Sequence, residues 1–149
     1  MRQELHLNIA KAFKRRRPSG LQNLEESHDF FAVIDELITE AFHETDMQYQ
    51  KKFGELSKQC GSTAVVCLII GQKIVCANLG DARALMCRNG KAMDLSVDYK
   101  ASRKDEQERI KNQGGYIVFG RVLGRLAVTR AFGDFECKQI PIKNEQTGQ

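Results

Sequence analysis

The fold is decided by the stretch Gly61-Ser-Thr-Ala-Val-Val-Cys-Leu-Ile-Ile-Gly-Gln-Lys-Ile-Val-Cys-Ala-Asn-Leu-Gly-Asp-Ala-Arg83. Within it, Gly71-Gln72 separates two apolar runs, Ala64 to Ile70 and Lys73 to Leu79. A two-residue connection that begins with glycine is typical of a type II′ turn, so the runs are predicted to pair as a β-hairpin. Because both runs are apolar at nearly every position, the strands are predicted to be covered on both faces.

An acidic residue follows where the second run ends. Asp81 lies in Leu79-Gly80-Asp81-Ala82-Arg83, where the chain leaves the predicted sheet. Side chains at such turns can converge on a ligand. An aspartate at a strand end is also a common Asx-turn residue or salt-bridge partner of a nearby arginine. The spacing alone leaves these alternatives open, with Asp81 as the candidate ligand residue.

The cysteines have no metal-binding spacing. The chain contains five of them: Cys60, Cys67, Cys76, Cys87 and Cys137. Their odd number and the lack of a C-x-x-C motif argue against a zinc site and against a disulfide framework. Pairing Ile70 with Lys73 would place Cys67 opposite Cys76, in a non-hydrogen-bonded pair close enough for a bridge. Reduced thiols remain the expectation in a cytoplasmic or nuclear protein.

Size and composition favour one soluble globular domain. The chain has 149 residues, of which 42% are hydrophobic and 28% are charged. No run approaches the roughly 20 apolar residues of a membrane span, and Met1-Arg-Gln-Glu-Leu-His lacks the apolar core of a signal peptide. A cytoplasmic or nuclear protein without a membrane role is therefore expected.

The net charge of +4 is unevenly distributed. One short stretch contains Lys11, Lys14, Arg15, Arg16 and Arg17. A solvated basic loop is the simplest interpretation, with nuclear targeting or an acidic partner as alternatives. No aromatic residues interleave the cluster, so nucleic-acid binding is not predicted.

The remaining elements are predicted from periodicity and turn residues. Residues 1–58 form a helical segment, with helices over Met1 to Phe13 and after a cap at Ser27 or Asp29. Asn89-Gly90 predicts a second hairpin, which makes the middle of the chain an antiparallel meander of about four strands.

Three features are predicted after this meander. Ser102-Arg-Lys-Asp105 has capping-box spacing and introduces a short, exposed helix near 105–113. Leu123-Gly124 predicts a turn between strands over Tyr116 to Val122 and Arg125 to Arg130. Residues 138–149 are predicted to be a flexible tail.

Several segments, in order, resemble the metal-dependent serine/threonine phosphatases of the PP2C family. They are Gly61-Ser-Thr-Ala64, Ala77-Asn-Leu-Gly-Asp-Ala-Arg-Ala84, Leu95-Ser-Val-Asp-Tyr-Lys100, Glu108-Arg-Ile-Lys-Asn-Gln-Gly-Gly115 and Arg121-Val-Leu-Gly-Arg-Leu-Ala-Val-Thr-Arg-Ala-Phe-Gly-Asp134. Ordered matches over about half the chain are far more specific than one short motif.

The resemblance implies an α+β fold, a partial α-β-β-α sandwich of antiparallel sheets flanked by helices. It also implies hydrolysis of phosphoserine or phosphothreonine by a water that two Mg²⁺ or Mn²⁺ ions activate. Phosphoprotein substrates or kinase-pathway proteins would be the partners. Arg83 and Arg130 are predicted to pair with nearby acids, and the matched glycines are predicted to serve turns and close packing.

The match also departs from the family pattern. The Asp-Gly-His-Gly-Gly segment and the later metal-binding aspartates of the family are absent from these 149 residues. Asp81 alone matches a metal-associated position, as a ligand of a weakly held third ion, and no catalytic or other cofactor-binding residue is assigned. We therefore expect one incomplete domain over residues 1–149 that is inactive and binds no Mg²⁺ or Mn²⁺ tightly. A non-catalytic pseudophosphatase or interaction module is the alternative, and self-association through exposed sheet edges is expected.

Overall fold

The computed structural model describes residues 3–16 and 30–138. In chain order, the elements are α1 (Leu5–Arg15), α2 (Phe30–Phe53), α3 (Leu56–Gln59), β1 (Gly61–Ser62), β2 (Ala64–Ile70), β3 (Lys73–Leu79), β4 (Leu85–Arg88), β5 (Lys91–Asp94), α4 (Lys104–Asn112), β6 (Ile117–Val118), β7 (Arg121–Val122), β8 (Phe132–Gly133) and α5 (Phe135–Lys138). The strands form antiparallel two-stranded ladders, which confirms the α+β class.

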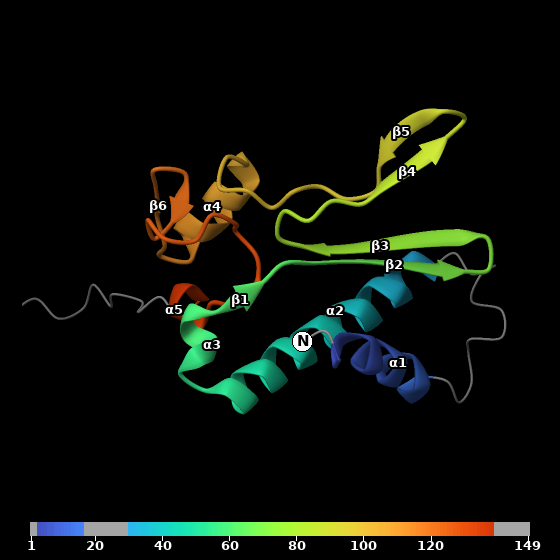
Figure 1. Cartoon of the computed structure of the whole chain (residues 1–149), viewed down its shortest axis with the longest axis horizontal. Helices are drawn as coiled ribbons and strands as arrows, with labels where there is room; N and C mark the ends of the chain where they lie inside the picture. The colour runs from blue at the N-terminus through green and yellow to red at the C-terminus, as the bar shows by residue number, and fades with distance from the viewer. Residues whose placement is uncertain (1–2, 17–29, 139–149) are drawn as a thin grey trace, which may run out of the picture.

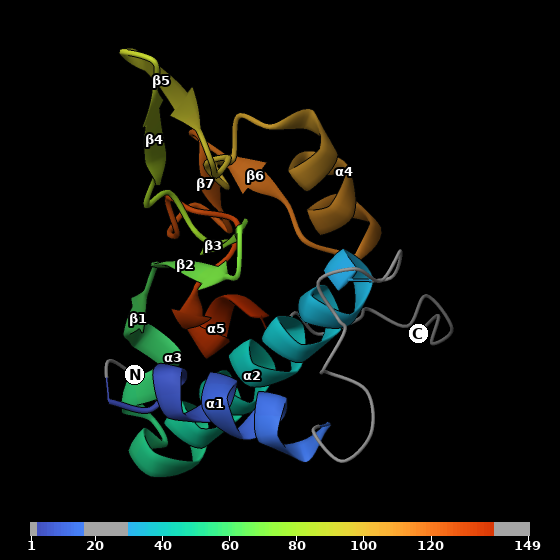
Figure 2. The same cartoon turned by 90° about the vertical axis from the view of Figure 1, so that its right-hand side faces the viewer.

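The main core lies between a helical layer and one face of the β2–β3 hairpin. Figures 1 and 2 show α1 beside α2, with the hairpin lying over both helices. The helices contribute the buried residues Ile9, Ala12, Phe30, Ile34, Leu37, Ile38 and Ala41. The inner face of the hairpin contributes Val66, Leu68, Ile70, Val75 and Ala77. These alternate positions share one face because side chains alternate along a strand.

The β2–β3 hairpin has the predicted register and turn. Ile70 pairs with Lys73, and Cys67 pairs with Cys76. Gly71 has a φ of +56°, as the first central position of a type II′ turn requires. The prediction that both faces of the strands are covered is wrong, because the helices cover one face only. On the other face Ile69 is 77% exposed.

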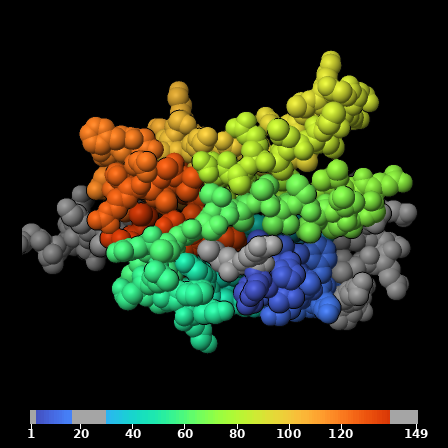
Figure 3. Space-filling model, in the orientation of Figure 1, coloured from blue at the N-terminus to red at the C-terminus, as the bar shows by residue number. Residues whose placement is uncertain are grey.

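The β4–β5 hairpin is separate from β2–β3. Asn89 and Gly90 both have positive φ, at 52° and 75°, which is the type I′ turn that this dipeptide favours. The described strands form no ladder between β3 and β4, so the predicted meander is two independent hairpins. Figure 3 shows β4–β5 projecting from the body of the molecule, in yellow-green.

The described part of the basic stretch, up to Arg16, belongs to a helix and its C-cap, which corrects the prediction of a solvated loop there. Helix α1 runs to Arg15, and Arg16 is its C-cap. Arg15 pairs with Glu40 at 2.7 Å and with Glu44 at 3.3 Å. Arg16 pairs with Glu36 at 2.8 Å. These basic side chains are therefore partly neutralised by the acidic face of α2.

Helix α4 begins differently from its prediction. Arg103 is the N-cap and makes no side-chain capping bond, while Asp105 accepts a hydrogen bond from Arg103 at 3.0 Å. Ser102 therefore does not form a capping box. The helix is also not fully exposed, because Glu106 and Ile110 are only 2% and 5% exposed.

The segment after α4 contains two tight turns where one hairpin is predicted. Strands β6 and β7 pair around Phe119-Gly120, whose φ values are 51° and 71°. Leu123-Gly124 makes the predicted turn, but that turn closes only an isolated bridge from Val122 to Leu126. Propensity did not indicate the first turn, because phenylalanine is unusual at positive φ.

Two predictions lie outside the described residues: the cap at Ser27 or Asp29 and the tail from 139 onwards. Within 3–16 and 30–138, no helix combines the length and apolar character that a membrane crossing needs.

A buried polar contact fixes α1 on α2. Asn8 is fully buried, and its Nδ2 donates to Thr45 Oγ1 at 3.0 Å and to Gln48 Oε1 at 2.9 Å. Thr45 Oγ1 in turn donates to the Ala41 carbonyl at 2.7 Å. Because Asn8 satisfies partners on α2 inside the helix interface, it specifies how the two helices align.

We predict that Asn8→Ala lowers the free energy of unfolding by about 1–3 kcal/mol, since Thr45 and Gln48 lose a buried partner. Urea denaturation followed by circular dichroism would measure the change. Lys14→Ala, on the exposed side of the same helix, is the matched control and should change little. Equal stability of the two variants would contradict a structural role for Asn8.

Candidate functional site

Asp81 lies in an exposed turn at the end of β3. Gly80 has a φ of +95°, and a Cβ there would approach Thr63 Cγ2 to 2.3 Å, so glycine is required at this position. The Gly80 carbonyl accepts hydrogen bonds from the Tyr99 amide at 2.8 Å and from Asn78 Nδ2 at 3.3 Å. The Asp81 side chain itself is exposed. The conformation of the turn is therefore fixed by hydrogen bonds to the Gly80 carbonyl and by the close packing of Gly80 on Thr63.

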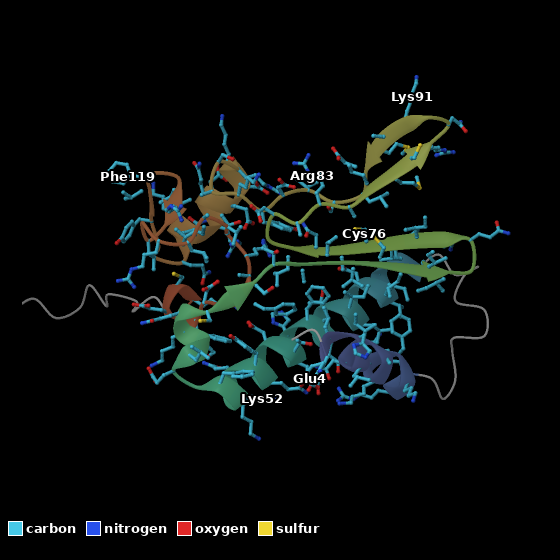
Figure 4. All side chains as sticks on the ribbon, viewed as in Figure 1. Glu4, Lys52, Cys76, Arg83, Lys91 and Phe119 are labelled. Carbon is cyan, nitrogen blue, oxygen red and sulfur yellow. The ribbon has the colours of Figure 1, made fainter. Side chains whose placement is uncertain are left out.

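Arg83 faces a carboxylate, as predicted. Its Nε and Nη2 donate to the two carboxylate oxygens of Asp98 at 2.9 and 2.8 Å. Lys100 Nζ lies 3.0 Å from the same carboxylate. Hydrogen bonds from Arg83 and Lys100 lower the pKa of Asp98 well below its usual range. Figure 4 places Arg83 on the segment that links β3 with β4.

Arg130 also faces a carboxylate, on α4. Its Nε and Nη2 donate to Glu106 at 3.0 and 2.7 Å, and Arg109 Nη2 donates to Glu106 at 2.8 Å. Burial alone would raise the pKa of Glu106, but these hydrogen bonds prevail and lower the pKa to about 2. The Glu106 carboxylate is therefore charged at neutral pH and bound by two guanidinium groups.

Tyr99 packs against two arginine side chains. Its ring centroid is 4.9 Å from Arg103 Cζ and 4.7 Å from Arg130 Cζ, which is cation–π distance. Its carbonyl accepts a hydrogen bond from the Thr129 amide at 2.8 Å. Segments 77–84, 95–100, 106–109 and 129–130 thus meet around one tyrosine.

A second junction joins α2 to β8. Asp46 Oδ1 accepts a hydrogen bond from the Gly133 amide at 2.7 Å, and Asp46 Oδ2 pairs with Lys138. Gly133 has a φ of +68°, and a Cβ there would lie 2.2 Å from the Cys60 carbonyl oxygen. The pKa of Asp134 is raised, mainly because the carboxyl group is partly buried. The positive charge of Lys138 opposes this rise, and the negative charge of Asp46 adds to it. The matched Phe-Gly-Asp turn therefore serves close packing.

The described residues do not fit a dinuclear Mg²⁺ or Mn²⁺ centre. Hard divalent ions need several oxygen ligands in fixed geometry. Within residues 3–16 and 30–138, no group of three or more histidine, cysteine, aspartate or glutamate side chains could hold a metal ion. Asp81 is one exposed carboxylate, and the arginines near it are committed to Asp98 and Glu106.

Known proteins share these segments. The sequence model of the family Protein phosphatase 2C matches residues 5–146. The chain belongs to the protein phosphatase 2C family. It is 42% identical over 124 residues to Probable protein phosphatase 2C 11 of Arabidopsis thaliana, covering 81% of this chain and 33% of that protein. It is 34% identical over 140 residues to Probable protein phosphatase 2C 59 of the same plant, covering 92% of this chain and 45% of the relative.

A rice relative is also matched over only part of its length. Probable protein phosphatase 2C 2 of Oryza sativa subsp. japonica is 39% identical over 117 residues, which cover 78% of this chain and 30% of the relative. This PP2C chain thus spans between 30% and 45% of the length of these three relatives.

Sequence reasoning anticipated the roles of Arg83 and Arg130 but not their partners. The structure supplies these partners as Asp98 and Glu106. Glu106 had a usable local signal, because it precedes Arg109 by three residues on a predicted helix, and such pairs face each other. Tyr99 had no signal of this kind, since its two arginines are brought to it by the tertiary fold.

We predict that Glu106→Gln lowers the free energy of unfolding by about 2 kcal/mol at neutral pH. This cost is below the roughly 3–5 kcal/mol of a fully buried pair, because both arginine side chains are 40% exposed. Urea titrations would measure it. Asp105→Asn, at the exposed neighbouring carboxylate, is the matched control and should have a much smaller effect.

The same substitution should change the acid limb of stability. Glu106 has a lowered pKa in the folded state, so its contribution is full above the unfolded pKa near 4.5 and disappears as the pH falls through about 2. The stability difference between wild type and Glu106→Gln should therefore shrink between those two pH values. A difference that stays constant over this range would contradict the charged state assigned to Glu106.

Proposed function

We propose that this chain is the central scaffold segment of a PP2C-type protein serine/threonine phosphatase. The longer protein would hydrolyse phosphoserine or phosphothreonine in phosphoprotein substrates, and residues 1–149 would form one incomplete domain. The observation that carries the proposal is that Arg83 and Arg130, from family-matched segments, bind Asp98 and Glu106 within the chain. These ion pairs join the matched segments to one another. The guanidinium groups of Arg83 and Arg130 are thus directed at carboxylates of the chain and not at a phosphate.

Metal binding is proposed for the longer protein only. Mg²⁺ or Mn²⁺ would be held mainly by carboxylates outside these 149 residues, with Asp81 contributing to a third, weaker site. Asp81 is exposed, and Arg83 and Arg130 pair with Asp98 and Glu106 and not with Asp81, which supports this assignment. By itself the chain is proposed to bind neither ion tightly and to be inactive.

A second candidate is a non-catalytic pseudophosphatase or interaction module. The outer face of the β2–β3 hairpin favours it, because Ile69 and Ile74 are exposed side by side in the register. A substrate protein or a kinase-pathway protein is the proposed partner, in the cytoplasm or the nucleus. No nucleic-acid partner is proposed.

We predict that the 149-residue chain shows no Mn²⁺-dependent release of phosphate from a phosphothreonine peptide. Titration calorimetry with Mn²⁺ should show only weak binding, which Asp81→Ala weakens further because the one carboxylate at the turn is lost. Asp94→Ala, at an exposed carboxylate on β5, is the control and should leave metal binding unchanged. Phosphate release that depends on Asp81 would contradict the assignment.

The two candidates can be separated by the encoding gene. An in-frame Asp-Gly-His-Gly-Gly segment upstream of Met1 supports the phosphatase, and expression of the extended protein should then yield Mn²⁺-dependent phosphothreonine hydrolysis. An extended protein that folds, carries no such segment and releases no phosphate would favour the interaction module.

We predict that the chain self-associates through its exposed sheet edges and the adjoining outer face of the β2–β3 hairpin. Sedimentation velocity should show a concentration-dependent increase in mass, and Ile69→Lys should reduce it because it places a charge on the apolar surface. Leu56→Lys is the control, since Leu56 is 57% exposed on α3 away from this face. A monomer at every concentration, with wild-type and Ile69→Lys chains alike, would refute the prediction.

A further inference from the structure

Two cysteines face each other on the open face of the β2–β3 hairpin. Cys67 on β2 is directly opposite Cys76 on β3, three register pairs from the turn. Cys67 is exposed and Cys76 is half-buried. They lie on the opposite side of the strands from Val66, Leu68, Val75 and Ala77, which pack on the helices. Figure 4 labels Cys76 on β3.

The register puts the two thiols within bonding geometry. Ile70 and Lys73 flank the two-residue turn, so they form a hydrogen-bonded pair, and pairs then alternate along the hairpin. By this alternation Cys67–Cys76 is a non-hydrogen-bonded pair, where the Cα atoms of antiparallel strands lie about 4.5 Å apart. That separation is within the roughly 4.4–6.8 Å range of disulfides, so a bridge needs no large backbone movement.

The structure holds the two cysteines as free thiols. All five cysteines are free, and Cys67 and Cys76 are directly opposite each other in the strand register. Burial, with a smaller effect of the neighbouring Cys67 thiol, raises the pKa of Cys76 to about 11. Cys76 therefore remains a protonated thiol at neutral pH, and Cys67 is the member of the pair that solvent reaches.

We propose that Cys67 and Cys76 form a redox-active dithiol, which closes into a cross-strand disulfide when it reacts with a small-molecule disulfide such as glutathione disulfide. The inference is independent of phosphatase activity, because it rests only on the hairpin register and on the exposure of one face.

The reaction is a two-step thiol–disulfide exchange. The Cys67 thiolate attacks one sulfur of glutathione disulfide, so that the S–S bond of glutathione disulfide breaks, a mixed disulfide forms between Cys67 and one glutathione, and the other glutathione leaves as a thiolate that takes up a proton. The Cys76 sulfur, losing its proton to solvent, then attacks the Cys67 sulfur and expels the second glutathione as a thiolate that takes up a proton. The protein loses two hydrogens, and one glutathione disulfide becomes two glutathiones.

The proposal is tested by peptide mapping of the 149-residue chain. The reduced protein is incubated with glutathione disulfide, quenched in acid, alkylated and digested with trypsin, which cuts after Lys73 and so separates the two cysteines. We expect peptide 59–73 to be linked to peptide 74–83, and dithiothreitol to release the link. Tandem mass spectrometry then distinguishes Cys67 from Cys60 within the first peptide.

Single substitutions assign the two roles. Cys76→Ser should stop the reaction at a stable glutathione adduct on Cys67, whereas Cys67→Ser should give neither the adduct on that strand nor the link. Cys87→Ser, on β4, is the matched control and should retain the link, because Cys87 is paired with Ala92. The same incubation in guanidinium chloride removes the register and should abolish the preference for this pair.

Two results would overturn the proposal. One is the absence of the link in the folded wild-type chain, with both thiols still open to alkylation after oxidation. The other is a link to Cys76 that persists in Cys67→Ser, which would assign the bridge to another cysteine. The peptide map of the wild-type chain shows by itself whether the link forms. The proposal is therefore tested even if one of the variants fails to fold.

Discussion

The inner face of the β2–β3 hairpin packs against α1 and α2, and the positions of most other elements follow from this contact. A slip of one residue in the hairpin would exchange Val66 and Leu68, which are partly buried against the helices, with the exposed Cys67 and Ile69. Apolar burial therefore fixes the register. Asn8 adds a directional constraint, because its buried amide has matching partners only where α2 presents Thr45 and Gln48.

Once β3 is in place, its end determines where the family-matched segments can meet. The chain leaves the sheet at Gly80, and the Gly80 carbonyl binds the Tyr99 amide. Tyr99 then contacts Arg130, and Arg130 binds Glu106 on α4. If either partner of such a pair is removed, the remaining charge is left unpaired and only partly solvated, which is destabilising. Arg83 and Arg130 of the PP2C pattern thus link segments that lie far apart in the sequence.

The second face of the hairpin has a different character, because the described residues provide no layer to cover it. Exposed apolar side chains and unpaired strand edges favour association with other protein surfaces. The same exposure makes Cys67 accessible while the register holds Cys76 opposite it. One geometric fact, a hairpin covered on one side, therefore underlies both the expected self-association and the proposed dithiol chemistry.

The sequence by itself determined the features that depend on neighbours along the chain. Gly71 and Asn89-Gly90 specify tight turns because their backbones tolerate positive φ, and the β2–β3 register, with Cys67 opposite Cys76, follows from the first turn. The ordered motifs also indicated the PP2C family. Tertiary structure alone decided which face of the hairpin is buried, where the turn at Phe119-Gly120 falls and which acids bind Arg83 and Arg130. The physical reason is that burial and ion pairing depend on segments far apart in sequence, whose proximity no local pattern encodes.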